Sequence, residues 1–134
     1  MDSRFEGPFL KSLAVILVFG VSMSIPVVVY DILKKSADNL MIKRDLDQIK
    51  TWGQIYKIKN GSYKGVNTYI EVIKKKIDID TLGGKTEVYV SPDSINFCAK
   101  SKLLNSRKNW CVDSTGYVGE NANACNKGGI GTCQ

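Results

Sequence analysis

The sequence predicts an α+β protein in which a long N-terminal transmembrane α-helix packs on a small antiparallel β-sheet. Three observations carry this prediction. The 134-residue chain has no charged side chain between Leu13 and Tyr30. Helical periodicity then continues to about residue 59. Strand-like segments bounded by turn residues follow, and all four cysteines lie in the last third of the chain. The expected organisation is a leader-like segment (1–8), a transmembrane helix (9–33), an amphipathic continuation (34–60) and a disulfide-bonded head (61–134).

The apolar run LAVILVFGVSMSIPVVVY is long enough to span a membrane. Eighteen helical residues rise about 27 Å, close to the ~30 Å of a bilayer's hydrocarbon core. A cleaved secretory signal with Arg4 and Lys11 as its basic region is one alternative, but the run is long for such a signal and no A-x-A-like site follows it. A buried core helix is the other, but only about a hundred residues remain to surround it. A retained membrane anchor is therefore favoured.

Eight residues of this first segment are expected to make the membrane and helix-packing contacts. They are Leu13, Val15, Ile16, Val18, Phe19, Gly20, Pro26 and Val28. Pro26 lacks a backbone donor, which predicts a kink or a locally melted segment between Gly20 and Pro26. It is either a proline of the kind that membrane helices tolerate or a joint that stretches when helices pack, and the sequence does not separate the two.

The second part of the helix is amphipathic. Apolar residues recur at intervals of three and four, with charged residues between them; they are Leu33, Ile42, Leu46, Ile49, and Ile55 or Tyr56. Asn60-Gly61-Ser62 is a strong helix breaker, and Gly61 can adopt the left-handed conformation of a C-terminal cap. The helix is therefore predicted to end near Lys59.

The head begins with a predicted short amphipathic helix within residues 64–84, ended by Gly83-Gly84. Its apolar positions are Tyr69, Ile70, Ile73 and Ile77. Strands are predicted over residues 86–91, 95–103 and 110–113, with turns at Pro92-Asp93 and Asn105-Ser106. From Gly116 onward the chain is rich in Gly and Asn and is predicted to be a loop.

Cys98, Cys111, Cys125 and Cys133 are an even number of cysteines in a small head, which indicates disulfides and an oxidising compartment outside the cytoplasm. No C-x-x-C and no histidine is present, so a zinc site is disfavoured. Four cysteines allow three connectivities. A hairpin centred near Leu104-Asn105 places Cys98 opposite Cys111, so the pairs Cys98–Cys111 and Cys125–Cys133, which close the shortest loops, are expected.

The composition argues against an enzyme. Without histidine no Ser/His/Asp set exists, and no glycine loop opens a helix as a phosphate site requires. Asp78 with Asp80, and Asp113 with Glu120, offer too few oxygen ligands for a cation. No enzymatic activity, cofactor, metal or small-molecule substrate is expected.

Two groups of motifs resemble those of type IV pilins and pseudopilins. The first is Leu46-Asp47-Gln48-Ile49-Lys50 with Trp52, Ile55, Tyr56 and Lys59-Asn60-Gly61-Ser62-Tyr63, which resembles the end of the long helix in these proteins. The second is Asn96-Phe97-Cys98-Ala99 with Trp110-Cys111-Val112-Asp113-Ser114-Thr115-Gly116, which is similar to the second half of minor pilins. The resemblance implies a pilin-like fold and a minor structural subunit of a type IV pilus or a type II secretion-like pseudopilus. Its partners would be membrane lipid and other pilin-like subunits, in a single-pass protein with an extracytoplasmic head that joins a cell-surface filament.

The N-terminus departs from the family pattern. Prepilins usually have a Gly–Phe junction for their peptidase and a glutamate at the fifth mature position. Here Gly7 precedes Pro8, which should hinder cleavage, and the glutamate position is occupied by Ser12 or Lys11, depending on the alignment. Processing at Gly7-Pro8 therefore stays open, as does the choice between a major and a minor subunit. The missing glutamate argues against a major subunit and is compatible with a minor or tip role.

The alternative function is a membrane-anchored binding protein whose basic head recognises DNA or another anionic surface. The formal net charge is +6, and all of the excess lies after residue 30. Lysines interleave with tyrosines as in a nucleic-acid groove; they are Lys57, Lys59, Lys64 and Lys74–Lys76, with Tyr56, Tyr63 and Tyr69. Helix-surface lysines and core tyrosines are the favoured interpretation of this pattern.

Overall fold

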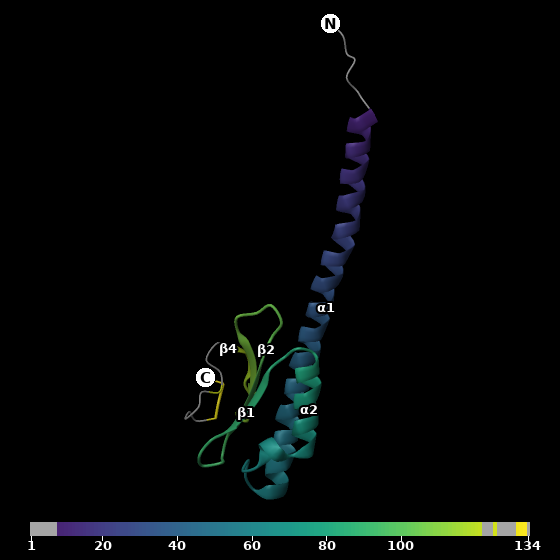
Figure 1. Cartoon of the computed structure of the whole chain (residues 1–134). Coiled ribbons are helices and arrows are strands. Elements are labelled where there is room, and N and C mark those ends of the chain that lie inside the picture. Colours follow the sequence, from purple (N-terminus) through teal and green to yellow (C-terminus); the bar gives the residue numbers. More distant parts are fainter. Residues whose placement is uncertain (1–7, 122–124, 126–130, 134) are drawn as a thin grey trace. The chain divides into compact units, whose positions relative to one another are not determined.

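The computed structural model describes residues 8–121, 125 and 131–133, with side chains from residue 26 onward. It divides into two compact units, residues 1–35 and 36–134. The elements are α1 (Pro8–Asn60), a 3-10 turn η1 (Val66–Thr68), α2 (Ile70–Thr81), and strands β1 (Thr86–Val90), β2 (Phe97–Lys102), β3 (Asn109–Asp113) and β4 (Val118–Asn121). The predicted α+β class, with a long N-terminal helix on an antiparallel sheet, is confirmed (Figure 1).

In the first unit, the helix begins at Pro8 and is unbroken across residues 20–26, so the predicted melted segment is absent. Its described apolar side chains are exposed, for example Val27 at 67% and Leu33 at 64%. Within the part of the chain that is described, no helix is both long and apolar enough to cross a membrane. The side chains of residues 13–25, which carry most of the predicted membrane segment, lie outside the described residues.

In the second unit, the C-terminal half of α1 packs on the sheet through one apolar stripe. Ile42, Leu46 and Ile49 are fully buried there, as the periodicity predicts. The helix approaches the sheet closely at Gly53, where an added Cβ would lie 2.5 Å from the Phe97 ring. The Gly61 amide donates to the Lys57 carbonyl (2.7 Å) with φ +77°, which confirms the predicted helix end.

The predicted short amphipathic helix is present as α2, which lies beside this half of α1 but turns a different face inward (Figure 1). Val72 and Ile79 are buried, whereas Ile70 and Ile77 are more than half exposed. Val72 and Ile79 join the hydrophobic core, and the buried Asp45 carboxylate of α1 lies 3.7 Å from Lys75 Nζ of α2.

The sheet is an antiparallel meander in the order β1-β2-β3-β4. The first three strands confirm the predicted segments with small shifts at their ends. Strand β4 is a correction, because residues 118–121 were predicted to be loop. It pairs with β3 from Val112↔Val118 to Asn109↔Asn121, and the glycines that favour a loop by composition are accommodated there because backbone pairing needs no side chain.

Candidate functional site: the disulfide-bonded face of the head

The face of the sheet opposite α1 carries two disulfides that differ from the predicted pairs. Cys98 on β2 is bonded to Cys125, and Cys111 on β3 to Cys133, with Cα–Cα distances of 5.7 and 5.9 Å. The expected pairs Cys98–Cys111 and Cys125–Cys133 are wrong. Both observed bonds join the sheet to the C-terminal segment, so they fix Cys125 and Cys133 over this face of the sheet.

The error arose from the register of the β2–β3 hairpin. Cys98 lies opposite Asp113, and Cys111 opposite Lys100, two residues away from the expected alignment. The turn does fall at Leu104-Asn105, where the Ser106 amide donates to the Leu103 carbonyl and Asn105 has φ +60°. Residues 107 and 108 then remain unpaired, which shifts the register. A shift of two keeps side chains on the same face, so the two cysteines are diagonal neighbours.

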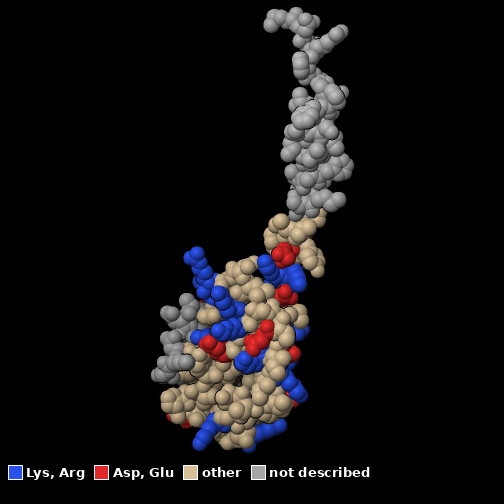
Figure 2. Space-filling view, in the orientation of Figure 1, with Lys and Arg blue, Asp and Glu red and all other residues tan. Residues whose placement is uncertain are grey.

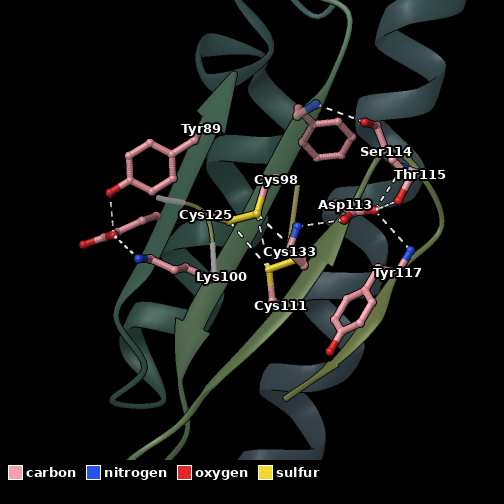
Figure 3. Close-up of a disulfide and its surroundings, with 12 residues drawn as sticks. Tyr89, Cys98, Lys100, Cys111, Asp113, Ser114, Thr115, Tyr117, Cys125 and Cys133 are labelled. Atoms are coloured by element: carbon pink, nitrogen blue, oxygen red, sulfur yellow. Dashed lines mark hydrogen bonds and ion pairs between the residues drawn. A yellow bond between two sulfur atoms is a disulfide. The ribbon is translucent and has the colours of Figure 1, made fainter. Parts of the chain in front are cut away.

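The four sulfur atoms form one buried cluster (Figure 3). All lie within 4.8 Å of one another, and sulfurs of different disulfides approach to 3.2 Å between Cys98 and Cys111. Tyr89 and Tyr117 pack against the cluster. Four thiolates so close together could ligate a soft metal ion, but sulfurs joined in disulfides are not thiolates. In this form the site acts as a covalent cross-link.

Asp113 is a fully buried carboxylate that organises the segment around the disulfides. Its Oδ1 accepts hydrogen bonds from the amide and hydroxyl of Thr115 (2.9 and 2.6 Å) and from the Tyr117 amide (3.1 Å). Its Oδ2 accepts from the Cys133 amide at 2.8 Å (Figure 3). One carboxylate therefore holds both the β3–β4 turn and the C-terminal cysteine, because several donors compensate the cost of its burial.

A second polar group, Glu87, Tyr89 and Lys100, lies on the same face. Tyr89 Oη donates to Glu87 Oε2 (2.6 Å), and Lys100 Nζ lies 3.3 Å from the same oxygen. The hydrogen bond from Tyr89 lowers the pKa of the Glu87 carboxyl, and the same bond raises the pKa of the Tyr89 hydroxyl. These groups satisfy one another, so they are a surface network rather than a reactive site.

The lysines and tyrosines of the alternative function do not form an exposed groove. Tyr63 is buried against Phe97, and the Tyr56 and Tyr69 rings pack together with their centroids 5.3 Å apart. Each of Lys74–Lys76 has a carboxylate within 3.2 Å. All of these residues are described. Among them, no tyrosine ring lies open between unpaired lysines, as stacking of a nucleic-acid base would require.

The two proposed cation pairs are likewise engaged within the protein. Asp78 pairs with Lys75 at 2.8 Å, and Asp80 with Lys76 at 2.7 Å. Asp113 is saturated by its hydrogen-bond donors, and Glu120 lies on β4 opposite Trp110. The structure does not bring either pair together as an ion site.

The remaining predicted residues lie in or before the first part of α1. Leu13, Val15, Ile16, Val18, Phe19 and Gly20 are helical, but their side chains lie outside the described residues. Pro26 and Val28 are helical and exposed. Gly7 lies outside the described residues, and Pro8 is the first residue of α1.

Two residues that organise the head were not predicted to do so. From the sequence, Asp113 was only part of a motif and half of a considered cation pair. The other is Asn39, whose side chain both accepts from the Leu104 amide (2.7 Å) and donates to its carbonyl (3.1 Å). A signal existed only for Asp113, since Asp-Ser-Thr-Gly is a turn sequence in which an aspartate bonds to following amides.

The head and the helix that packs on it have a pilin-like α+β architecture with a disulfide-bonded C-terminal region. Comparison of the chain with known protein families, characterised proteins and solved structures gives no significant match.

Proposed function

We propose that this protein is a structural subunit, of the minor kind, of a type IV pilus or a type II secretion-like pseudopilus. It assembles through its hydrophobic N-terminal helix. Its disulfide-bonded head lies outside the cytoplasm, where such bonds persist. The chain performs no chemistry in this role, and its partners are membrane lipid and other pilin-like subunits.

The observation that carries the proposal is the contrast in burial along α1. Ile42, Leu46 and Ile49 are fully buried by the protein's own sheet. Val27 and Leu33, earlier in the same helix, are about two-thirds exposed. Exposed apolar residues at the end of an uncharged 18-residue run need another apolar environment. Lipid before assembly and neighbouring helices after it would supply that environment.

The head suits an assembled subunit in a second way. Its four-stranded sheet is covered on one face by α1 and α2 and on the other by the cross-linked C-terminal segment. Disulfides stabilise small domains that cannot bury a large core, and they resist reduction outside the cytoplasm. A filament subunit benefits because a head that unfolds locally would disturb its neighbours.

The test places charges in the apolar run. The variant carries Val15→Asp and Val18→Asp, and each charge costs about 3 kcal/mol near the centre of a membrane helix. The matched control carries Ile58→Asp and Ile77→Asp, at apolar positions that are exposed elsewhere, 83% and 55%. Membrane fractions after alkaline carbonate extraction, and filaments sheared from the cell surface, are probed with an antibody to the head.

The proposal expects the native chain and the control in both fractions, and the Val15/Val18 variant in neither. Equal recovery of that variant in membranes and filaments would contradict it. A native chain found in membranes but absent from every filament would support the membrane anchor and contradict the filament role. Mass spectrometry of the same material shows whether the chain is cleaved between Gly7 and Pro8.

A further inference from the structure

Basic side chains that form no ion pair gather at the end of the head where β2 and β3 are joined. Lys85, Lys102, Arg107 and Lys108 are all exposed. Among the described residues, none of them has a carboxylate within the 4.0 Å limit of an ion pair, in contrast to Lys74–Lys76 on α2. Figure 2 shows the basic atoms at this end of the head, beside few acidic ones. These four residues are called the hairpin basic cluster below.

The strand register brings these charges together. Lys85 and Lys102 each lie one residue beyond the terminal β1–β2 pair, Thr86↔Ser101. Lys102 is in turn opposite Asn109, which follows Lys108. Like charges at neighbouring cross-strand positions repel one another. Fixed, unpaired positive charge of this kind is relieved when an anion binds.

The loop that carries the cluster is held in place. Asn39 of α1 makes two hydrogen bonds to the backbone of Leu104, at 2.7 and 3.1 Å. Leu103 is buried in the core. The charges of Arg107 and Lys108 are therefore presented from an anchored turn, which reduces the entropy lost when they bind a surface.

We infer that the hairpin basic cluster binds the anionic headgroups of phospholipids in the membrane that holds the chain. The inference rests on the proposed function, because it needs the apolar run in the bilayer. Asn39, which anchors the hairpin, follows Tyr30 by nine residues. Even a fully extended chain of that length reaches only about 30 Å. The length of this connection allows the hairpin to reach the headgroup layer, where each basic side chain favours contact with anionic lipid about fivefold.

A lipid surface fits this cluster better than nucleic acid does. Single-stranded nucleic acid is held by exposed aromatic faces as well as by charge. The aromatic residue of this hairpin, Trp110, is half-buried, and Lys43 Nζ lies 4.1 Å from its ring centroid. The cluster offers charge alone, which suits a headgroup layer.

The test is lysine footprinting of the full chain in nanodiscs of neutral phosphatidylcholine or of phosphatidylcholine with phosphatidylglycerol. An amine-reactive ester labels exposed lysines, and mass spectrometry gives the rate at each site. We expect Lys102 and Lys108 to react at least about fivefold more slowly in anionic discs, an effect that high salt removes. Lys59, in the last turn of α1, and Lys64, just after that helix, should change little.

Two variants that lose the same number of positive charges distinguish the effect of the cluster from the effect of net charge. With Lys102, Arg107 and Lys108 replaced by Gln, the protection of Lys85 in anionic discs should be lost. With Lys57, Lys59 and Lys64 replaced by Gln, it should remain. Equal labelling of Lys102 and Lys108 in both kinds of disc would overturn the inference. So would protection by duplex DNA in neutral discs without protection by anionic lipid, which would identify a nucleic-acid surface.

The two proposals fail differently in this experiment. A chain that does not enter neutral discs contradicts the membrane anchor, and the inference falls with it. A chain that enters both kinds of disc but shows no lipid-dependent labelling overturns the inference alone.

Discussion

Both faces of the four-stranded sheet carry fully buried residues, but these are buried by different means. On one face Phe97, Ala99 and Val112 lie under the apolar stripe of α1. On the other, Cys98 and Cys111 are bonded to Cys125 and Cys133, and the buried Asp113 accepts a hydrogen bond from the Cys133 amide. Figure 1 shows the helices on the first face only. The first face is therefore stabilised by packing, and the second by covalent bonds and one carboxylate.

The difference follows from what covers each face. A helix brings a stripe of large side chains, so the area it buries is enough to hold it. The C-terminal segment from residue 116 is rich in Gly and Asn and has little apolar area to bury. Fixing such a chain over a sheet costs conformational entropy that contacts alone do not offset. Cross-links lower that cost by restricting the unfolded chain.

Removal of the disulfides should have the largest effect on the free energy of unfolding, and it acts on the outer face. The bonds span 27 and 22 residues, so the chain-entropy estimate is about 3.5 kcal/mol each. With the four cysteines replaced by Ser, we expect the head to lose most of its stability, measured by urea unfolding in detergent. Unfolding unchanged within about 1 kcal/mol would show that the outer face holds without cross-links.

The pairing itself is measurable by mapping peptides without reduction. Trypsin alone leaves Cys111 and Cys125 in one fragment, so a protease that cleaves after Glu120 is added. The structure predicts that fragment 88–100 is joined to 121–127, and 109–120 to 128–134. A link between 88–100 and 109–120 would instead support the shorter-loop pairing.

On the helix face, Leu46→Ala tests packing. Leu46 is fully buried in the centre of the stripe, so its truncation leaves a cavity in the core. We expect a loss of about 2–5 kcal/mol in the free energy of unfolding. Leu40→Ala on the same helix is the control, since Leu40 is 65% exposed and its truncation should cost well under 1 kcal/mol.

Asp113→Asn tests the polar part of the outer face. The amide cannot accept at both of its terminal atoms, so either the Cys133 amide or the Thr115–Tyr117 turn loses its acceptor. An unsatisfied buried donor costs about 1–3 kcal/mol. Hydrogen exchange should accelerate at the Cys133, Thr115 or Tyr117 amides, while amides of α1 stay protected. Uniform acceleration across the head would argue against a role confined to this face.

The sequence predicted the helix face far better than the outer face, for a physical reason. The stripe Ile42, Leu46, Ile49 depends on local periodicity, which one helix displays by itself. The disulfide pairs depend on register, and register was set by two unpaired loop residues and by the distant contact of Asn39 with Leu104. The inward turn of Val72 in place of Ile70 likewise depends on tertiary packing, since Val72 joins the core and Ile70 is exposed. No local pattern encodes such contacts.

Gly53→Ala measures how closely the helix face is packed. The added methyl would lie 2.5 Å from the Phe97 ring, so the ring or the helix must shift. Overpacking costs about 1–3 kcal/mol, and the better helix propensity of Ala returns up to about 1 kcal/mol. A net loss of about 1 kcal/mol is expected. Phe97→Leu should reduce the penalty for Gly53→Ala in a double-mutant cycle; additive effects would show that the ring does not limit this contact.

The smallest expected effect concerns Asp80, the carboxylate that ties α2 to β1. It accepts from Lys76 Nζ (2.7 Å) and from the Thr86 amide (3.0 Å). Burial acts to raise the pKa of the Asp80 carboxyl, but the hydrogen bonds from Lys76 and Thr86 lower it further, so it lies below its ordinary value. The stability gained is therefore present above the unfolded pKa of about 4 and is lost as the pH falls through the folded value.

Asp80→Asn removes that pH dependence. The urea midpoint of the native protein should exceed that of the variant at pH 7, and the gap should narrow below about pH 4. Asp47→Asn removes the same charge from a more exposed carboxylate, 56% against 36% for Asp80, so it controls for net charge. A gap that persists unchanged at pH 3 would mean that Asp80 stabilises the helix face through its neutral hydrogen bonds. In that case the negative charge of the Asp80 carboxylate would not contribute to the stability of the helix face.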